Sequence, residues 1–551
     1  MSGFGAVDWA VVGGFLALTT LLGERLAGRQ ATLRDYFLGG RRLPWWAVAG
    51  SIVATEVSAI TFVSLPFVVF RDGGDLTYLQ LGVFGLLIAR LIVGYALVPR
   101  YFERELYSPY DLVGERLGVG ARRAASALFS AGGVLAQASR VYLTAVVLEV
   151  LLHGELAALE QRVGVPPLAA SVAAIGAVSV VWTWLGGMAT VIWTDAMLFV
   201  VFLVGIAISI ATATAGVDGG AAEVLATARD AGKLRLLDFD TDPAKAYTFW
   251  AALFAYTIWG VGAFGTDQLL AQRLFCCRDA RDARRAIVAS NAALVVTALA
   301  ALLGMALFAY YQAHPLEGEA LALYEEKGDR IFPIFILEAV PTGLRGLIVA
   351  GVFAAAISSL DSILAALSQT ALATVVPERL RSVRTSRVLV VVFGVLLCVL
   401  AVQMERAHAR YPSILDLALA MAGYTVGALL AGVLLALWPG GRDGRGYAWS
   451  APLAAMTVVA VAWHTSASRT ACAVFAAALV VLGLVRLRDA RVALLAAGGA
   501  GLVALSLWDG LRLAWPWNAP IGLAVAYGFG WLLSKPAPYP AEPSAPPGDR
   551  R

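Results

Sequence analysis

The chain has 551 residues, of which 60% are hydrophobic and 15% charged, with a mean hydropathy of +0.76 and a formal net charge of +4. An ordinary soluble domain is about 45–50% apolar and about 25% charged, so this composition excludes one and predicts a polytopic membrane protein. The positions of the lysines and arginines are more informative than their sum, because they set the orientation of membrane helices.

Runs of about 20 apolar residues predict fifteen membrane-spanning helices along the chain. The last four runs are less clearly delimited than the first eleven, so the expected total is 13–15 spans. In chain order the runs lie near 6–26, 45–70, 76–99, 121–152, 167–186, 188–212, 246–270, 286–312, 343–375, 384–406, 411–436, 447–465, 470–487, 491–510 and 515–534.

The loops between these runs differ in charge from one side to the other. Most of the 42 lysines and arginines lie in loops that follow the odd-numbered runs. The positive-inside rule therefore predicts a multi-pass protein of the plasma or inner membrane, with its N-terminus outside and its C-terminus in the cytoplasm. The Pro-rich tail, 535–551, is expected to be disordered.

Two of the predicted spans are interrupted. The second carries Thr55, Glu56, Ser58 and Thr61 at its middle, and the seventh has several glycines before Asp267. Two interrupted helices five spans apart indicate an inverted-repeat transporter with its site at the membrane midplane.

The expected fold is therefore an all-α membrane protein with an inverted repeat of two times five helices, of the LeuT-like kind. The predicted parts are an N-terminal span and loop (1–44), a transport core (45–436) whose repeats are 45–212 and 246–436, additional C-terminal spans (437–534) and the tail (535–551).

Ionisable residues inside the spans are costly and so are expected to be paired or functional. Their summed charge is negative by one, which a bound cation or a proton on one carboxyl would offset. They are Glu56, Arg90, Arg140, Asp195 and Asp361.

The segment AAAISSLDS, 354–362, places hydroxyl and carboxyl oxygens on one helix face, since Ser358, Asp361 and Ser362 are spaced i, i+3 and i+4. Na⁺ prefers oxygen ligands, and Asp195 and the carbonyls of the interrupted second span could add to them. The alternative for each hydroxyl is a hydrogen bond to its own helix backbone.

Several segments together resemble those of the sodium:solute symporter family, which includes sodium-coupled glucose, monocarboxylate, proline and sialic-acid transporters. The resemblance covers 6–436, with WPWNAPIG near the end also typical of the family. The other matching segments are DYFLGGRRLPWW, GGMATVIWTDAMLF, GTDQLLAQRL and GVFAAAISSLDS.

The resemblance implies a Na⁺ site formed by the carbonyls of Ala54, Val57 and Ala355 and the hydroxyls of Ser358 and Ser359. Some family members have a second Na⁺ site, which here would use Ser358, Asp361, Ser362 and Asp195. Asp361 replaces a hydroxyl of those members, so it would either tighten a second Na⁺ or let a proton take its place.

The resemblance also implies a solute site at Ser58, Thr61, Gln80 and Arg140. Arg140 would hold a carboxylate through its planar guanidinium, or it would pair with Glu56 instead. Arg90 is expected to be structural, and Asp267 and Gln268 to belong to a structural or gating network.

We therefore predict a secondary active transporter that carries a small polar organic solute, of carboxylate, sugar or sialic-acid-like type, with Na⁺. Its partners would be the solute, Na⁺ and the bilayer, with no nucleic acid and no obligatory protein partner. The motifs GxxxxGK[ST], HExxH and GxSxG are absent from the sequence, which argues against an ATP-driven pump or a common hydrolase. The alternatives are proton coupling through Asp361 and Asp195, or a transporter-like membrane sensor.

Overall fold

The computed structural model describes residues 4–27, 38–57, 59–103, 106, 108–185, 188–438, 442–487 and 489–536. These residues are largely helical and contain no strand, only two isolated bridges. The predicted all-α fold class is confirmed. The expected disordered tail lies almost wholly outside the described residues.

The helices up to the middle of the chain include three π-helical segments. They are α1 (Ala6–Ala27), α3 (Trp45–Val57), α4 (Ala59–Phe70), η3 (Leu81–Leu86), α5 (Leu87–Ile92), η4 (Val93–Leu97), α6 (Val98–Phe102), α7 (Pro109–Leu117), α8 (Val119–Leu151), α9 (His153–Val163), α10 (Pro167–Leu185), α11 (Met188–Ala215), α12 (Gly220–Asp230), η5 (Ala251–Tyr256), α13 (Thr257–Gly265) and α14 (Gln268–Phe275).

The remaining helices lie in the second half of the chain. They are α15 (Ala280–Ala289), α16 (Ala293–Ala313), α17 (Gly318–Glu326), α18 (Ile331–Ala339), α19 (Leu344–Thr374), α20 (Val383–His408), α21 (Ile414–Leu437), α22 (Tyr447–Ala462), α23 (Ser466–Arg486), α24 (Arg491–Leu507) and α25 (Asn518–Leu533).

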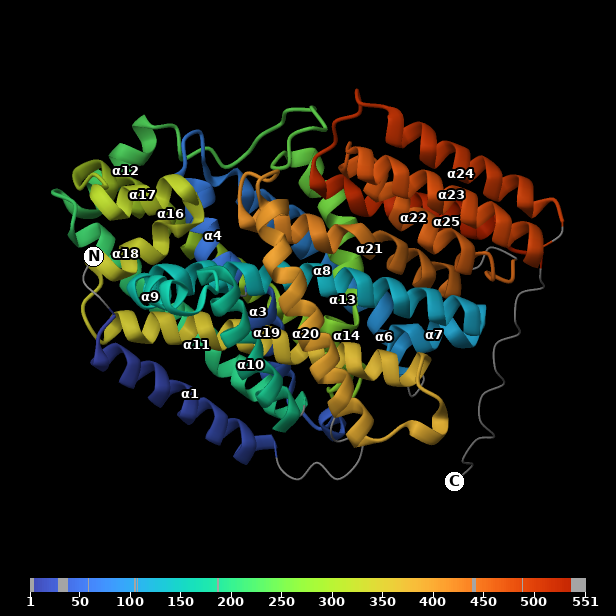
Figure 1. Cartoon of the computed structure of the whole chain (residues 1–551), viewed down its shortest axis with the longest axis horizontal. Helices are drawn as coiled ribbons and strands as arrows, with labels where there is room; N and C mark the ends of the chain where they lie inside the picture. The colour runs from blue at the N-terminus through green and yellow to red at the C-terminus, as the bar shows by residue number, and fades with distance from the viewer. Residues whose placement is uncertain are drawn as a thin grey trace.

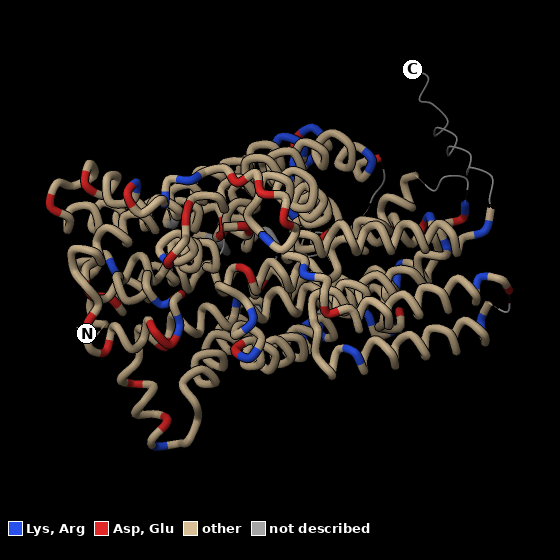
Figure 2. Tube along the Cα trace, turned by 90° about the horizontal axis from the view of Figure 1, so that it is seen from above, with Lys and Arg blue, Asp and Glu red and all other residues tan. Residues whose placement is uncertain are grey.

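Among the described residues, eight helices are long and apolar enough to cross a membrane, or up to ten if each of two bent pairs is one span. Four further helices of the described residues are apolar but shorter, with 10–17 residues each, and they include Ala6–Thr19 and Ala251–Gly265. Figure 2 shows long uncharged stretches in the helices. The membrane character predicted from composition is confirmed.

Both predicted interruptions are present. The helices α3 and α4 meet at an angle of 49°, on either side of position 58, which is outside the described residues. Helix α13 ends at Gly265, and α14 begins after Asp267, whose carboxylate accepts a hydrogen bond from the Leu269 amide at 2.8 Å. This N-cap stabilises the start of a new helix inside the protein.

The glycines of α13 allow it to pass close to its neighbours. A Cβ at Gly260 would lie 2.7 Å from the Cβ of Ala89, and one at Gly262 would lie 2.6 Å from Val426. Real Cβ atoms do not approach so closely. Because both glycines are needed for contact with α5 and α21, the glycine cluster serves packing beside the break.

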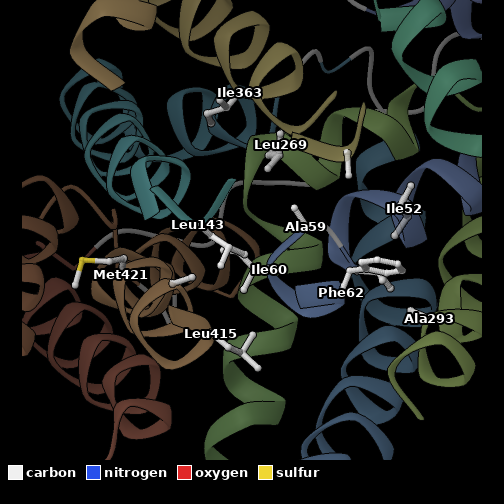
Figure 3. Packing of buried hydrophobic residues seen from close by; sticks show 14 of the residues in the cluster. Ile52, Ala59, Ile60, Phe62, Leu143, Leu269, Ala293, Ile363, Leu415 and Met421 are labelled. Carbon is white, nitrogen blue, oxygen red and sulfur yellow. The ribbon is translucent and has the colours of Figure 1, made fainter. Parts of the chain in front are cut away.

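The broken helices lie within a bundle whose centre is formed by α8, α19 and α21. Figure 3 shows Ile60 of α4, Leu143 of α8 and Leu415 of α21 gathered in one part of the buried core. The four C-terminal helices lie together beside α21, and α1 runs along α11 and α19 (Figure 1). The core helices therefore enclose the broken segments, and the added helices pack outside them.

The loop after α12 is anchored by one lysine. Lys233 is 2% exposed, and its ammonium lies 4.2 Å from the ring centroid of Phe308. Lys233 Nζ donates to two carbonyls at the end of α4, Val69 (2.7 Å) and Phe70 (3.1 Å), and to two in the turn that follows, Arg71 (3.0 Å) and Gly74 (3.2 Å). The last carbonyls of a helix have no partner within it, so the lysine acts as a C-terminal cap of α4.

Candidate functional site

A central cavity lies between the two broken helices. It consists of two adjoining spaces of about 90 Å³ each, which share Glu56, Thr61, Arg140 and Trp259 in their walls. Its other walls come from α8, α14 and α21. The cavity therefore lies at the place where the sequence predicts a site in an inverted-repeat transporter.

Arg140 lines this cavity without an ion pair. Its Nη1 donates a hydrogen bond to the Thr55 carbonyl at 3.3 Å, and no carboxylate of a described residue lies within 4.0 Å of it. Glu56 instead forms its ion pair with Arg90. The sequence left two interpretations open for Arg140, which were a carboxylate of the solute or an ion pair with Glu56. The ion pair of Arg140 with Glu56 is not present in the structure.

Arg90 is fully buried and held on every side. Besides Glu56, its guanidinium donates to Ser290 Oγ at 3.1 Å and to Asn291 Oδ1 at 3.2 Å, and it lies 4.5 Å from the ring centroid of Phe264. A buried charge needs such partners, because an isolated one is costly. Arg90 thus joins α3, α5, α13 and the α15–α16 corner.

A second polar cluster lies around Asp195 of α11, which is 1% exposed. Asp195 Oδ2 accepts hydrogen bonds from Ser51 Oγ at 2.7 Å and from Arg273 Nη2 at 3.0 Å, and Oδ1 accepts one from Ser358. Arg273 also donates to Ser362 Oγ at 2.8 Å. Asp195, Ser358 and Ser362, which the sequence grouped as a second ion site, do lie together, but with a guanidinium among them.

Asp361, the fourth residue of that predicted group, is buried yet bonded elsewhere. Its Oδ1 accepts a hydrogen bond from Thr183 Oγ1 of α10 at 2.9 Å. No described basic residue lies within 4.0 Å of its carboxyl group. Asp361 therefore lies beside the Asp195 cluster and is held by a different helix.

The residues expected to form the first Na⁺ site come from α3 and α19, which pack against each other. Ala54 and Val57 belong to the last turn of α3, where carbonyls have no intrahelical donor. Ala355 and Ser359 are both 2% exposed, so the carbonyl and the hydroxyl that the resemblance assigns to this site lie inside the protein. Carbonyl and hydroxyl oxygens are ligands that a hard cation prefers.

The other predicted site residues are dispersed. Thr61 lines the cavity, whereas Gln80 donates to the Tyr247 carbonyl at 2.8 Å and is not among the cavity residues. Asp267 lines the cavity from the α13–α14 break, and Gln268 contacts Gln369 of α19 at 3.4 Å. Ser58 lies outside the described residues.

A model of the sodium:solute symporter family matches residues 36–449, about three quarters of the chain. The chain belongs to that family. It is a transporter and not an enzyme, and Na⁺-coupled symport of a solute is the activity of the family's members.

Two curated relatives illustrate the range of the family. The sodium/sialic acid symporter SiaT of Proteus mirabilis is 29% identical over 405 residues, which are 71% of this chain and 77% of the relative. The sodium-coupled monocarboxylate transporter 2 of Bos taurus is 28% identical over 382 residues, which are 68% of this symporter but only 58% of the relative.

A solved structure supports the fold. The substrate-bound, outward-open structure of a Na⁺-coupled sialic acid symporter has a TM-score of 0.71 with this symporter at 22% identity, over 96% of this chain and 97% of the other. The LeuT-like inverted-repeat fold predicted from the two interrupted helices is confirmed.

Sequence reasoning did not assign Ser51 and Thr183 to the site. It also missed Gln137 and Trp259 of the cavity wall. Gln137 had a usable signal, because it precedes Arg140 by three residues and so shares its helix face.

Proposed function

We propose that this symporter carries a small polar organic solute bearing a carboxylate, together with Na⁺, into the cell by alternating access. The observation that carries the proposal is Arg140, whose guanidinium lines the cavity and bonds to a neutral carbonyl. Because Arg90 already balances Glu56, Arg140 remains available to a negative charge on a solute. The sialic acid and monocarboxylate relatives have acidic solutes, which agrees with this assignment.

Na⁺ would bind at the contact of α3 with α19. The carbonyls of Ala54, Val57 and Ala355 and the hydroxyls of Ser358 and Ser359 would supply the oxygen ligands that a hard cation prefers. The burial of Ser359 on α19, which packs against α3, supports this ligand set. The ion would join the broken helix to α19 beside the cavity, so that ion and solute binding favour each other by linkage.

The solute would lie in the central cavity, with its carboxylate on Arg140 and with Thr61 and Ser58 as polar neighbours. Gln80 would join only if its bond to the Tyr247 carbonyl opened. Asp267 and Gln268 would act at the break between α13 and α14, as a structural or gating contact with α19.

The orientation that we propose follows from the charge of the loops, with the N-terminus outside and the C-terminus in the cytoplasm. Na⁺ would enter from outside, down its gradient and with the membrane potential, which contributes about 2.3 kcal/mol per charge per 100 mV. Residues 45–212 and 246–436 would form the two repeats, and rocking of one helix bundle against the other would expose ion and solute to the cytoplasm.

A screen of the purified protein against a panel of small acids, neutral sugars and sugar acids tests this proposal. A bound ligand raises thermal stability by RT ln(1 + [L]/Kd). We expect acids to raise Tm in NaCl and much less in KCl. Stabilisation by neutral sugars alone, or equal stabilisation in both salts, would contradict the proposal.

Proton coupling is the second candidate function, and Asp361 is the observation that favours it. Asp361 is 8% exposed, and its carboxylate accepts a hydrogen bond from a neutral hydroxyl and has no described basic partner, so binding a proton would lower the cost of burying its charge. Uptake in Na⁺-free medium at several pH values separates the two candidates. Persistent uptake that rises with acidity would favour the proton, and its loss without Na⁺ would favour Na⁺.

A further inference from the structure

Gln137 is a polar side chain with no evident structural task. It is 2% exposed and lines the central cavity, and its Oε1 forms no hydrogen bond with any described residue. Trp259 of α13, which also lines the cavity, likewise has an indole Nε1–H without a partner among the described residues. Buried polar atoms nearly always have partners, so two such atoms around one cavity indicate that a ligand supplies them.

The wall around Gln137 is built to leave room for a ligand. Besides Phe129, the residues of α8 that line the cavity before Gln137 are Gly132, Gly133 and Ala136, which are small. A Cβ at Gly133 would lie 3.0 Å from Ile363 Cδ1, so a larger side chain would press on α19. Small residues therefore keep open the space that Gln137 and Arg140 share.

The spacing of Gln137 and Arg140 limits the solute. Residues three apart on a helix have Cβ atoms about 5–6 Å apart on one face. A carboxylate on Arg140 therefore brings a group one or two carbons away within reach of the Gln137 amide. Asp267, a carboxylate in the same wall, favours a group at that position that donates hydrogen bonds.

The size of the space agrees with a small molecule. Each of the two adjoining parts offers about 90 Å³ to the centres of water-sized spheres, and one water needs about 10–15 Å³ on that measure. In this conformation the cavity therefore has room for a small organic acid.

We propose that Gln137 determines specificity, accepting a hydrogen bond from a hydroxyl or ammonium group next to the solute's carboxylate. This inference rests on the proposed function, since it takes Arg140 as the carboxylate site. Trp259 Nε1–H donates to an oxygen on the other side of the solute. The preferred solute class is thus a small 2- or 3-substituted acid with a donor group, and not a plain fatty acid.

The test compares three acids of similar size on purified protein in NaCl. L-lactate has a hydroxyl donor beside its carboxylate, pyruvate has only an acceptor there, and propionate has neither. The variants are Gln137→Leu and, as a matched control, Ser139→Ala. Ser139 is buried on the same helix, bonds to the Ala136 carbonyl at 2.7 Å, and does not line the cavity.

We expect the wild type and Ser139→Ala to bind lactate at least about tenfold more tightly than propionate, judged by thermal shift. In Gln137→Leu the ratio should fall to about one. The unliganded Gln137→Leu protein should be at least as stable as the wild type, because it loses an amide without a partner.

Equal binding of the three acids by the wild type, an unchanged ratio in Gln137→Leu, or a failure of that variant to fold would each overturn the inference. If Na⁺ raises the Tm of the wild type but the three acids bind equally, the proposed function stands and only the role of Gln137 is wrong. If Na⁺ does not raise the Tm at all, both the proposed function and the role of Gln137 are wrong.

Discussion

Arg273 and Asp195 form an ion pair that is closed off from solvent, with Arg273 Nη2 3.0 Å from Asp195 Oδ2 and neither side chain more than 1% exposed. The two residues lie 78 positions apart, and together with Ser51 and Ser362 they join α3, α11, α14 and α19. The cluster around this pair therefore connects the two broken helices to α11 and α19.

Removing one partner of this pair should be much more harmful than removing both. Arg273→Met or Asp195→Asn alone leaves a buried group without its partner, which costs about 3–5 kcal/mol. The double variant should recover part of that loss. Arg469→Met is the matched control, because its pair with Asp509 is exposed and worth less than about 1 kcal/mol. Thermal unfolding in detergent measures all four, and additive losses would contradict direct pairing.

Ser359→Ala should raise the Na⁺ concentration needed for half-maximal uptake. The loss of one oxygen ligand is worth on the order of 1 kcal/mol, or about fivefold in that concentration. Ser368→Ala is the control, since Ser368 is buried on the same helix nine residues further on. An equal Na⁺ dependence in both variants would count against the ion site.

Arg140→Gln should abolish stabilisation by acidic solutes while leaving the rise of Tm with Na⁺ in place. The guanidinium offers two parallel charge-assisted hydrogen bonds that an amide cannot replace. Thermal shift with acids in NaCl measures the effect. If Arg140→Gln kept its response to acids, the carboxylate would have to bind elsewhere.

Lys233→Met should destabilise the protein by about 1–3 kcal/mol. The substitution leaves the carbonyls at the end of α4 without their donor, and this desolvated state is costly. Lys245→Met is the control, because Lys245 is exposed, pairs with Asp240, and should change stability by no more than about 0.5 kcal/mol. Similar Tm values for the two variants would show that the lysine cap is unimportant.

Glu326 on α17 predicts a small pH dependence outside the spans. Burial raises its pKa, but the hydrogen bond and charge of Arg330, at 2.6 Å, outweigh burial and hold the pKa below its usual value. A lowered pKa gives stability that is present above about pH 4.5 and is lost as pH falls through the folded pKa. Wild type should exceed Glu326→Gln in Tm at pH 7, by a difference that shrinks toward pH 4. A constant difference would contradict this role.

The helix breaks and much of the polar cluster could be predicted because they leave local signals. Polar residues at mid-span and glycines before Asp267 mark the breaks, and the WTD and SSLDS segments mark Asp195, Ser358 and Ser362. Each of these signals is a residue that is costly in an apolar run, so it can be recognised without any knowledge of tertiary contacts.

The partners of these groups could not be predicted, because they depend on distances between helices far apart in sequence. Arg273 and Arg90 were visible in the chain, but nothing local indicated that they pair with Asp195 and Glu56. The spacing grouped Asp361 with Ser362, but the side chains of two successive helix residues point in directions about 100° apart. Ser362 therefore faces Arg273, whereas Asp361 faces Thr183 of α10.

Accumulation of a labelled small acid in proteoliposomes, driven by an imposed Na⁺ gradient, tests the coupling most directly. Uptake against the solute's own gradient should require Na⁺, collapse when the Na⁺ gradient is dissipated, and need more Na⁺ in Ser359→Ala. Uptake that continues without Na⁺, follows an imposed pH gradient and is unchanged by Ser359→Ala would contradict Na⁺ coupling at the α3–α19 contact.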